Sequence, residues 1–292
     1  MIISQIIGGL GNQMFQYAMG RALSLENRQP LMLDISDFDG YDLHQGFELQ
    51  RIFNASILIA QPSDIQHVLG WQSPHFVRWL LMRPAFSGLR GEKFVLEPHF
   101  QYWSKVSDIQ GDCYVRGYWQ SEKYFQKHTA TIRQDFSFKL PLTGKNAELV
   151  SQMTQVNAIS LHVRRGDYVN NSKTNSVHGV CSLDYYQAAV EYILKRVEKP
   201  CFFVFSDDIP WVKKNLKIGM PCEYVDHNQG PASHLDMQLM SKCRHHIIAN
   251  SSFSWWGAWL NLDPHKIVIA PRKWFSASKN TADLLPIAWT AL

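Results

Sequence analysis

Apolar residues recur at two different spacings in the first forty residues of the chain. A short apolar run at 2–7 predicts a buried strand, and a glycine turn at 8–11 follows it. In the next segment, 12–27, apolar residues return every three or four positions, which predicts a helix with one buried face. A second apolar run at 30–36 completes a βαβ pattern. The apolar positions of the helix are Met14, Phe15, Ala18, Ala22 and Leu25.

The same alternation of apolar runs and helical patterns returns in the second half of the chain. The predicted strands are 158–163, 201–206, 222–225, 245–250 and 266–270, and the predicted helices lie at about 183–197, 210–217, 233–243 and 253–260. Strands that alternate with helices indicate a parallel, doubly wound sheet. Prolines interrupt residues 40–130, which predicts helices and long loops there.

The pattern of apolar and polar residues changes at 139–150, which we predict to be a linker. We therefore expect an α/β protein with two Rossmann-like domains that face each other across a cleft. The boundaries are predicted at 1–145 and 146–292.

Composition and charge limit the classes of function. Hydrophobic residues make up 46% and charged residues 18% of the chain, which is typical of a globular protein with a large core. The net charge is +4, and no run of Lys or Arg is longer than two. This mild positive charge suits a small anionic ligand and falls short of a nucleic-acid-binding surface.

The cysteines and the amino terminus indicate a cytoplasmic protein. The five cysteines are odd in number, widely spaced and without a CxxC motif, which argues against a disulfide framework and against a zinc site. The first ten residues are too short for a signal peptide, and no apolar run approaches 18 residues. Asp37 and Asp39 have the DxD spacing of metal-dependent sugar transferases. They fall in a turn, where aspartates are common, and we expect no metal.

Two adjacent arginines follow the predicted strand 158–163. Ligands bind at the carboxyl ends of strands in open parallel sheets, and the forked guanidinium groups of Arg164 and Arg165 match phosphate oxygens. The pattern therefore predicts an anion site, with a structural ion pair to Asp167 or another carboxylate as the alternative. His162 points to the opposite face of the strand from Leu161, and it is either an interior histidine or a catalytic one.

Hydroxyl-bearing residues and carboxylates follow two other predicted strands. Asn250, Ser251, Ser252 and Ser254 open the helix at 253–260, where free backbone N–H groups attract phosphate. The alternative is simple helix capping, with the neighbouring tryptophans in the core. Asp207 and Asp208 end the strand 201–206 and bring carboxylates to the same rim.

The glycine turn at the start of the chain matches the dinucleotide-binding fingerprint only in part. Gly9 and Gly11 fit the pattern, but Met14 occupies the third glycine position. The turn indicates that the backbone comes close to a ligand there, and Asn12 and Gln13 open the helix that follows.

Four blocks of this sequence together resemble the bacterial α1,2-fucosyltransferases, which are inverting, GDP-fucose-dependent enzymes with a GT-B-like fold. The blocks are GGLGNQMFQYA, HVRRGDY, FSDD and NSSFSWWGAWL, and they occur in the expected order. The resemblance implies that Arg165, with Arg164 beside it, holds the β-phosphate of GDP, and that Ser251 and Ser252 approach the phosphates.

A looser similarity to the α1,6- and protein O-fucosyltransferases implies that Asp236 accepts hydrogen bonds from guanine. The alternative is an aspartate favoured by the dipole in the first turn of a helix. The residues expected to bind GDP-fucose are Gly9, Gly11, Asn12, Gln13, Arg164, Arg165, Asp208, Asp236, Asn250, Ser251, Ser252 and Ser254.

The resemblance implies transfer of L-fucose to the 2-hydroxyl of a terminal β-galactoside, without a metal cofactor. The expected partners are GDP-fucose and the β-galactoside glycan, and a peripheral contact with the inner face of a membrane is left open. Arg165 would stabilise the leaving phosphate. Asp167 is the first candidate for the base and His162 the second, and a reaction without a dedicated base is the third alternative.

The amino-terminal domain is expected to bind the acceptor, and the carboxy-terminal domain the GDP-sugar. Conceivable acceptor contacts are Asp34, Asp37, Tyr41 and Trp119. The functional alternatives are a transferase for another GDP-sugar, such as GDP-mannose, a non-catalytic GDP-binding scaffold and a glycoside hydrolase. A hydrolase needs two carboxylates at a defined separation, and Asp207 and Asp208 are adjacent in sequence.

Overall fold

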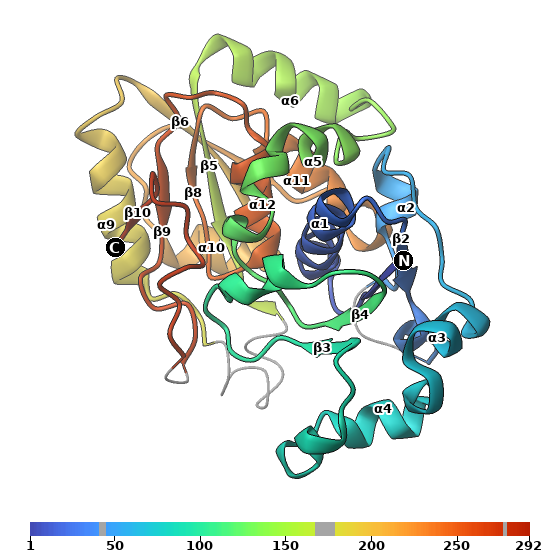
Figure 1. Cartoon of the computed structure of the whole chain (residues 1–292). Helices are drawn as coiled ribbons and strands as arrows, with labels where there is room; N and C mark the ends of the chain where they lie inside the picture. Colours follow the sequence, from blue (N-terminus) through green and yellow to red (C-terminus); the bar gives the residue numbers. More distant parts are fainter. Residues whose placement is uncertain (41–44, 167–178, 277–278) are drawn as a thin grey trace. The chain divides into compact units, whose positions relative to one another are not determined.

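The chain divides into two compact units. The computed structural model describes residues 1–40, 45–166, 179–276 and 279–292 (Figure 1). Unit 1 comprises Met1–Lys139 and Ala282–Leu284, and unit 2 comprises Leu140–Thr281 and Leu285–Leu292. The predicted boundary after residue 145 differs from this division. Residues 144–150 of the predicted linker belong to a helix, whose Leu149 packs in the core of unit 2.

Unit 1 contains a parallel sheet with the strand order β2-β1-β4-β3. The central strand β1 (Ile2–Gln5) pairs with β2 (Leu31–Asp34) on one side and with β4 (Cys113–Arg116) on the other. The outer strand β3 (Phe94–Leu96) pairs with β4. The first two strands were predicted. The strands β3 and β4 were missed, and they lie in the region predicted to hold helices and loops. Strands of three or four residues are too short to show a periodicity.

The first helix, α1 (Leu10–Asn27), is buried on almost every side along its first four turns. The predicted apolar face is only part of this surface, since Gln13 and Gln16 are also fully buried. The helix ends at Arg28, which has the left-handed conformation (φ 54°), and its backbone N–H donates to the carbonyl of Leu25. The prediction of a single buried face therefore understated how much of this helix is buried.

Short helices complete unit 1. They are α2 (Leu49–Ile52), α3 (Pro62–Leu69), α4 (His75–Leu81) and α5 (Thr129–Asp135), with 3-10 turns η1 (Ser36–Phe38), η2 (Gly70–Gln72), η3 (Pro84–Leu89), η4 (Ser104–Asp108), η5 (Glu122–Tyr124) and η6 (Gln126–His128). A buried ion pair attaches α4 to the sheet. The Nη1 atom of Arg78 lies 2.5 Å from Oδ2 of Asp34, and the Tyr114 hydroxyl donates to the same oxygen at 2.6 Å.

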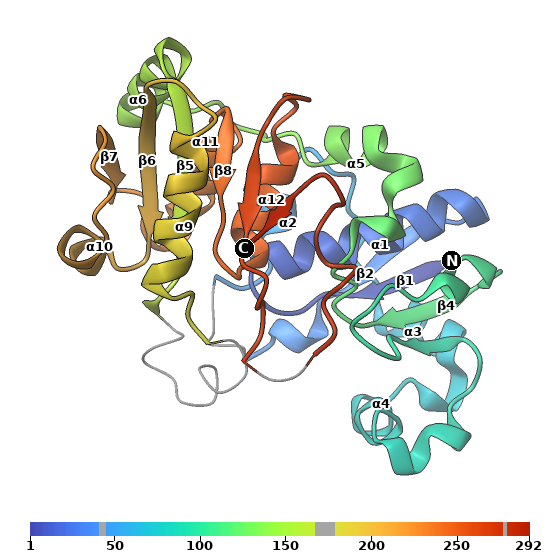
Figure 2. The same cartoon turned by 90° about the vertical axis from the view of Figure 1, so that its left-hand side faces the viewer.

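Unit 2 contains a wider parallel sheet with the strand order β10-β9-β8-β5-β6-β7 (Figure 2). The bounds are β5 (Asn157–Val163), β6 (Pro200–Ser206), β7 (Cys222–Val225), β8 (His245–Ile247), β9 (Val268–Ala270) and β10 (Thr290–Ala291). The five strands predicted in this half are confirmed. The edge strand β10 was missed because it is only two residues long.

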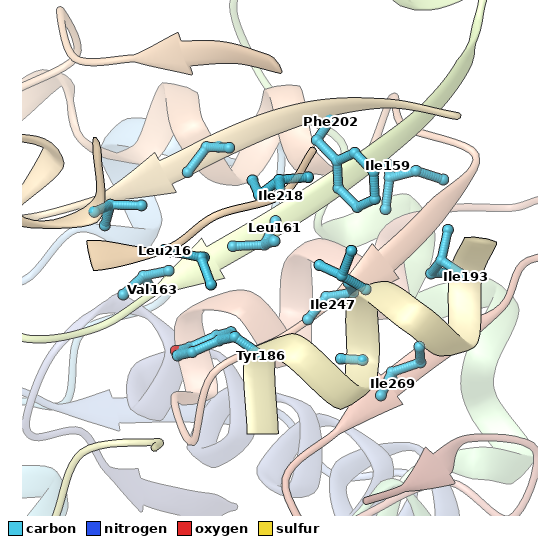
Figure 3. Packing of buried hydrophobic residues seen from close by; sticks show 14 of the residues in the cluster. Ile159, Leu161, Val163, Tyr186, Ile193, Phe202, Leu216, Ile218, Ile247 and Ile269 are labelled. Atoms are coloured by element: carbon cyan, nitrogen blue, oxygen red, sulfur yellow. The ribbon is translucent and has the colours of Figure 1, made fainter. Parts of the chain in front are cut away.

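Helices cover both faces of this sheet. They are α6 (Gly144–Gln155), α9 (Leu183–Leu194), α10 (Ile209–Asn215), α11 (His234–Met240) and α12 (Ser252–Leu260), with the 3-10 turn η7 (Gly230–Ala232). On one face Ile159 and Leu161 pack with Tyr186 and Ile193 of α9 (Figure 3). Alternate strand residues pack on the other face against α6 and α11. A parallel sheet buried on both faces confirms the predicted doubly wound class.

Among the described residues, none of the helices combines the length and the apolar character needed to cross a membrane.

Candidate functional site

Two charged pairs stand at the carboxyl edge of the sheet in unit 2. Strand β5 delivers Arg164 and Arg165, and the adjacent strand β6 delivers Asp207 and Asp208, because Val163 pairs in register with Ser206. The Nε atom of Arg164 lies 3.2 Å from Oδ2 of Asp207, and the backbone N–H of Arg165 donates to Oδ1 of Asp207 at 2.8 Å. The side chain of Asp207 therefore fixes the side chain of Arg164 and the backbone of Arg165.

Gly166 follows the arginines in close contact with Asp207. A Cβ atom at this position would lie 2.9 Å from Oδ2 of Asp207, closer than carbon and oxygen normally approach. The glycine therefore allows the chain to pass over the carboxylate that holds Arg164 and Arg165.

The guanidinium of Arg165 is stacked on an aromatic ring. Its Cζ lies 3.6 Å from the centroid of Trp211, in the first turn of α10. Its Nε is 3.5 Å from Oδ2 of Asp208, too long for a good hydrogen bond, and has no hydrogen-bond partner among the described residues. The stack restricts the guanidinium to one plane. The sequence could not show this, because Trp211 resembles any core tryptophan.

Asp208 was predicted to contact GDP-fucose, but the structure gives this side chain a capping role. It is the N-cap of α10, and its Oδ1 accepts a hydrogen bond from the backbone N–H of Trp211 at 3.1 Å. Capping fixes the start of the helix and thereby the position of the ring under Arg165. The contacts of Asp208 are accounted for without a ligand.

His162 is an interior residue. Its ring is buried, with its centroid 6.0 Å from that of Phe253, and Nδ1 has no hydrogen-bond partner among the described residues. Burial, together with the charge of Arg164, lowers the pKa of His162 to about 3. The ring is therefore neutral near pH 7 and a weak base, which favours the interior interpretation over the catalytic one. Asp167, the other candidate for the base, lies outside the described residues.

The predicted phosphate contacts at the amino end of α12 separate into two groups. The Nδ2 atom of the buried Asn250 donates to the carbonyls of Gly179 and Trp274, each at 3.1 Å. The hydroxyl of Ser254, also buried, donates to the carbonyl of Ser251 at 3.3 Å. These hydrogen bonds tie Asn250 and Ser254 to the fold, and their contact with phosphate stays a prediction. Ser251 and Ser252 stand at the amino end of α12 and stay predicted phosphate contacts.

The tryptophans of the same block are part of the core, as the capping alternative proposes. Trp255 and Trp256 are fully buried, and their ring centroids are 4.9 Å apart in an edge-to-face arrangement. Trp255 also stacks on Trp259. The block therefore combines a packed helix with a polar amino end.

Asp236 takes part in a network of amide side chains. In the first turn of α11, its Oδ1 accepts from Nδ2 of Asn228 at 2.8 Å. Asn228 exchanges hydrogen bonds with Asn146, which also contacts Nε2 of His227 at 2.8 Å. Burial raises the pKa of Asp236 to about 7, although the Asn228 bond favours the ionised form. The carboxylate therefore lacks enough hydrogen-bond donors to offset its burial.

The glycine turn of unit 1 is held by its own polar side chains. Nε2 of Gln13 donates to the carbonyls of Gly8 and Gly46, each at 2.8 Å, while its Oε1 accepts from the backbone N–H of Glu48. Asn12 accepts a hydrogen bond from Gln120 at 2.7 Å. The buried Gln13 thus fixes the turn, and its contact with GDP-fucose stays a prediction. The conformation that favours glycine in this turn is at Gly8, with φ 85°.

Two of the conceivable acceptor contacts are inside the protein. Asp34 is buried in the ion pair with Arg78, and the side chain of Trp119 is fully buried. Neither can reach an acceptor, and both suggestions were wrong. Asp37 lines a cavity in unit 1, and Tyr41 lies outside the described residues.

No group of three or more His, Cys, Asp and Glu side chains that could hold a metal ion occurs in the part of the chain that the structure describes. The expectation that the reaction needs no metal stays a prediction.

With its parallel α/β sheets and its arginine pair at a sheet edge, the protein has the features of a nucleotide-sugar glycosyltransferase. The model of glycosyl transferase family 11 matches residues 87–292, and the chain belongs to this family. It is 36% identical over 295 residues to an α-1,2-colitosyltransferase of Escherichia coli, covering 100% of this chain and 98% of the relative. The predicted membership is confirmed.

More distant similarities extend to a mammalian enzyme and to a solved structure. A galactoside 2-α-L-fucosyltransferase, SEC1 of Bos taurus, is 24% identical over 254 residues, covering 87% of this chain and 62% of the relative. The crystal structure of NodZ α-1,6-fucosyltransferase soaked with GDP-fucose matches with a TM-score of 0.54 at 14% identity, covering 92% of this chain and 94% of that one. The second likeness shows the shared fold.

Proposed function

We propose that this protein transfers L-fucose from GDP-fucose to the 2-hydroxyl of a terminal β-galactoside, with inversion to an α1,2 linkage. Membership of glycosyl transferase family 11 supports transfer from a nucleotide sugar. The observation that carries the proposal is the fixed position of Arg165. Its guanidinium is stacked on Trp211, and its backbone N–H donates to Asp207.

This arrangement suits a departing diphosphate. When the bond between C1 and the phosphate oxygen breaks, negative charge develops on the β-phosphate and positive charge on the sugar ring. A guanidinium held in advance stabilises that charge without reorganising during the reaction. The arginine pair can therefore supply the charge stabilisation for which other transferases use a divalent cation.

The acceptor hydroxyl would attack C1 from the face opposite the phosphate. Its proton would pass to Asp167, or to solvent in a reaction without a dedicated base. His162 is a poor candidate, because its pKa of about 3 makes the neutral ring a weak base. The α1,2 linkage agrees with the names of the related α-1,2-colitosyltransferase and of the bovine galactoside 2-α-L-fucosyltransferase.

Asp236 is suited to guanine, whose N1–H and exocyclic amino group are adjacent hydrogen-bond donors. Binding would supply the donors that the buried carboxylate lacks and would favour its ionised form. Because burial raises the pKa to about 7 in the free protein, the binding-competent carboxylate is a minor species at pH 6 and the main one at pH 8. The affinity for GDP should therefore rise with pH.

We expect the Kd for GDP to fall by about tenfold between pH 6 and pH 8, because the apparent affinity is reduced by the fraction of competent protein. Isothermal titration calorimetry of the parent and of Asp236→Asn measures this. The phosphate groups of GDP change their protonation in the same way with both proteins. The difference between the two proteins in the pH dependence of the Kd therefore reports on Asp236. An equal pH dependence in both proteins would exclude the proposed guanine contact.

The activity is tested by mixing the protein with GDP-fucose and a β-galactoside in the presence of EDTA. We expect GDP release together with a product heavier by one fucose, whose linkage NMR identifies as α1,2. Binding of GDP without any product would favour a scaffold, and GDP release without a glycan product would favour hydrolysis of the donor. Loss of activity in EDTA with recovery in magnesium would contradict the metal-free mechanism.

A second donor follows from the E. coli relative, which is named as a colitosyltransferase. Colitose is fucose without the hydroxyl at C3, so GDP-colitose is the informative competitor. A site that hydrogen-bonds this hydroxyl discriminates strongly against the deoxy sugar, whereas a site that only encloses it does not. Parallel measurements of kcat/KM for GDP-fucose, GDP-colitose and GDP-mannose would assign the donor.

A further inference from the structure

A cavity of about 350 Å³ lies at the carboxyl edge of the sheet in unit 1. Neighbouring strands β2, β1 and β4 all end beside it, and α4 and the residue after it line another part of the wall. The lining residues are Ile7, Ser36, Asp37, Asp39, His75, Trp79, Met82 and Arg116. The carboxyl edge is where open parallel sheets bind ligands, and the volume is within the range of small-molecule sites.

The charged groups of this cavity are paired across the sheet edge. Oδ1 of Asp37 lies 3.1 Å from Nε2 of His75, and Oδ2 lies 3.3 Å from Nη2 of Arg116. The side-chain amide of Gln5 also donates to Asp37. A carboxylate held from three sides has a fixed orientation. Because acidic and basic groups alternate in the wall, the cavity favours neither an anion nor a cation.

Trp79 adds an aromatic surface to the same wall. Its side chain is 42% exposed, although it is one of the largest apolar residues of the chain. The guanidinium of Arg83 lies 4.0 Å from its ring centroid, and Phe76 stacks on it with a centroid distance of 5.9 Å. The ring is thus held in place and still presents apolar area. An exposed aromatic ring beside fixed hydrogen-bonding groups indicates a ligand with both an apolar and a polar side.

We infer that this cavity binds a neutral pyranose of the acceptor glycan, an inference that rests on the proposed function. A pyranose has an apolar face of C–H groups, which would pack on Trp79. Its hydroxyls donate to carboxylates, here Asp37 and Asp39, and accept from a guanidinium, here Arg116. The paired charges of the wall give no net attraction for a phosphate. The DxD pair thus has a use that involves no metal.

The first test is direct binding. In saturation-transfer NMR with lactose and with methyl β-D-galactoside, the parent protein should give a signal that Trp79→Ala and Asp39→Asn lose. Trp71→Ala is the matched control, because Trp71 is 63% exposed in the same unit and does not line the cavity. Retention of the signal by Trp79→Ala, or its equal loss from Trp71→Ala, would overturn the inference.

The second test separates the acceptor from the donor. In Trp79→Ala we expect the KM for the galactoside to rise about tenfold or more, as for the loss of roughly 1.4 kcal/mol of binding, while the KM for the GDP-sugar stays the same. A parallel rise in both values would contradict the assignment to the acceptor. Thermal melting of each variant checks that the fold is retained.

These outcomes distinguish the two proposals. If galactoside binding depends on Trp79 but no GDP-sugar yields a product with a galactoside, the cavity is a saccharide site and the proposed transfer is wrong. If fucosylated product forms at the parent's KM in Trp79→Ala, the transfer stands and the cavity is not the acceptor site.

Discussion

Turnover of the Arg165→Ala variant is expected to fall by about 10²–10³-fold, the usual cost of removing one fixed donor that faces developing negative charge. Arg165 is the member of the pair whose guanidinium is stacked on Trp211, so it has lost its freedom to rotate before substrate binds. Its charge is then available to the leaving phosphate without a cost of ordering. Steady-state kinetics with GDP-fucose and a β-galactoside measures the loss of kcat.

The variants around Arg165 test whether geometry or charge matters. Arg165→Lys keeps the charge but loses the planar fork, and we expect it to recover only part of the activity. The matched control is Arg196→Ala, because Arg196 also stacks on a ring of unit 2, with its Cζ 3.5 Å from the centroid of Tyr192. That variant should turn over like the parent. Near-normal turnover of Arg165→Ala would refute the leaving-group role.

The sequence predicted the sheet of unit 2 well because its inner strands are buried on both faces. Strands β5 and β6 are seven residues long and mainly apolar, so they stand out from the helical patterns around them. In unit 1 the strands β3 and β4 have three and four residues and were missed. Short strands are defined by their pairing partners, which a single sequence does not show.

The sequence predicts a residue of the candidate site where that residue directly follows a recognisable strand. Arg164 and Arg165 follow a clear strand, and this placed them at a sheet edge. Their partners depend on which strand lies next to β5, and this order sets Asp207 beside Arg164. The hydrogen bonds of Asn250 and Ser254 to backbone carbonyls were not predicted, because the sequence does not reveal which carbonyls lie close to these side chains.

The cavity of unit 1 shows the other limit of sequence reasoning. Its wall comes from the ends of three strands and from α4, and the fold brings Asp37, His75 and Arg116 together from separate parts of the chain. Of these, only Asp37 was considered from the sequence as an acceptor contact. Trp119 was also named as a conceivable acceptor contact, yet its side chain is fully buried. Exposure of an aromatic ring, not its presence, marks a saccharide surface.

Loss of the buried arginine of unit 1 is expected to cost about 3–5 kcal/mol of unfolding free energy, since Arg78→Met would leave the carboxylate of Asp34 buried without its cation. Burial acts to raise the pKa of Asp34, but hydrogen bonds from Tyr114 and Ser36 and the charge of Arg78 outweigh it and hold the pKa below its usual value. A depressed pKa in the folded state stabilises the protein above the unfolded value near 4, and this contribution is lost as the pH falls further.

Urea unfolding of the single and double variants measures this cost. Asp34→Asn combined with Arg78→Met should destabilise the protein by less than the sum of the two single changes, because the double variant leaves no unpaired charge. Lys127→Ala removes an exposed partner of Glu26, at 3.7 Å, and should change the stability by at most about 1 kcal/mol. A small loss in Arg78→Met, similar to that control, would contradict a structural ion pair. Because Arg78 also attaches α4 to the sheet, its loss should weaken galactoside binding through Trp79 even where the variant stays folded.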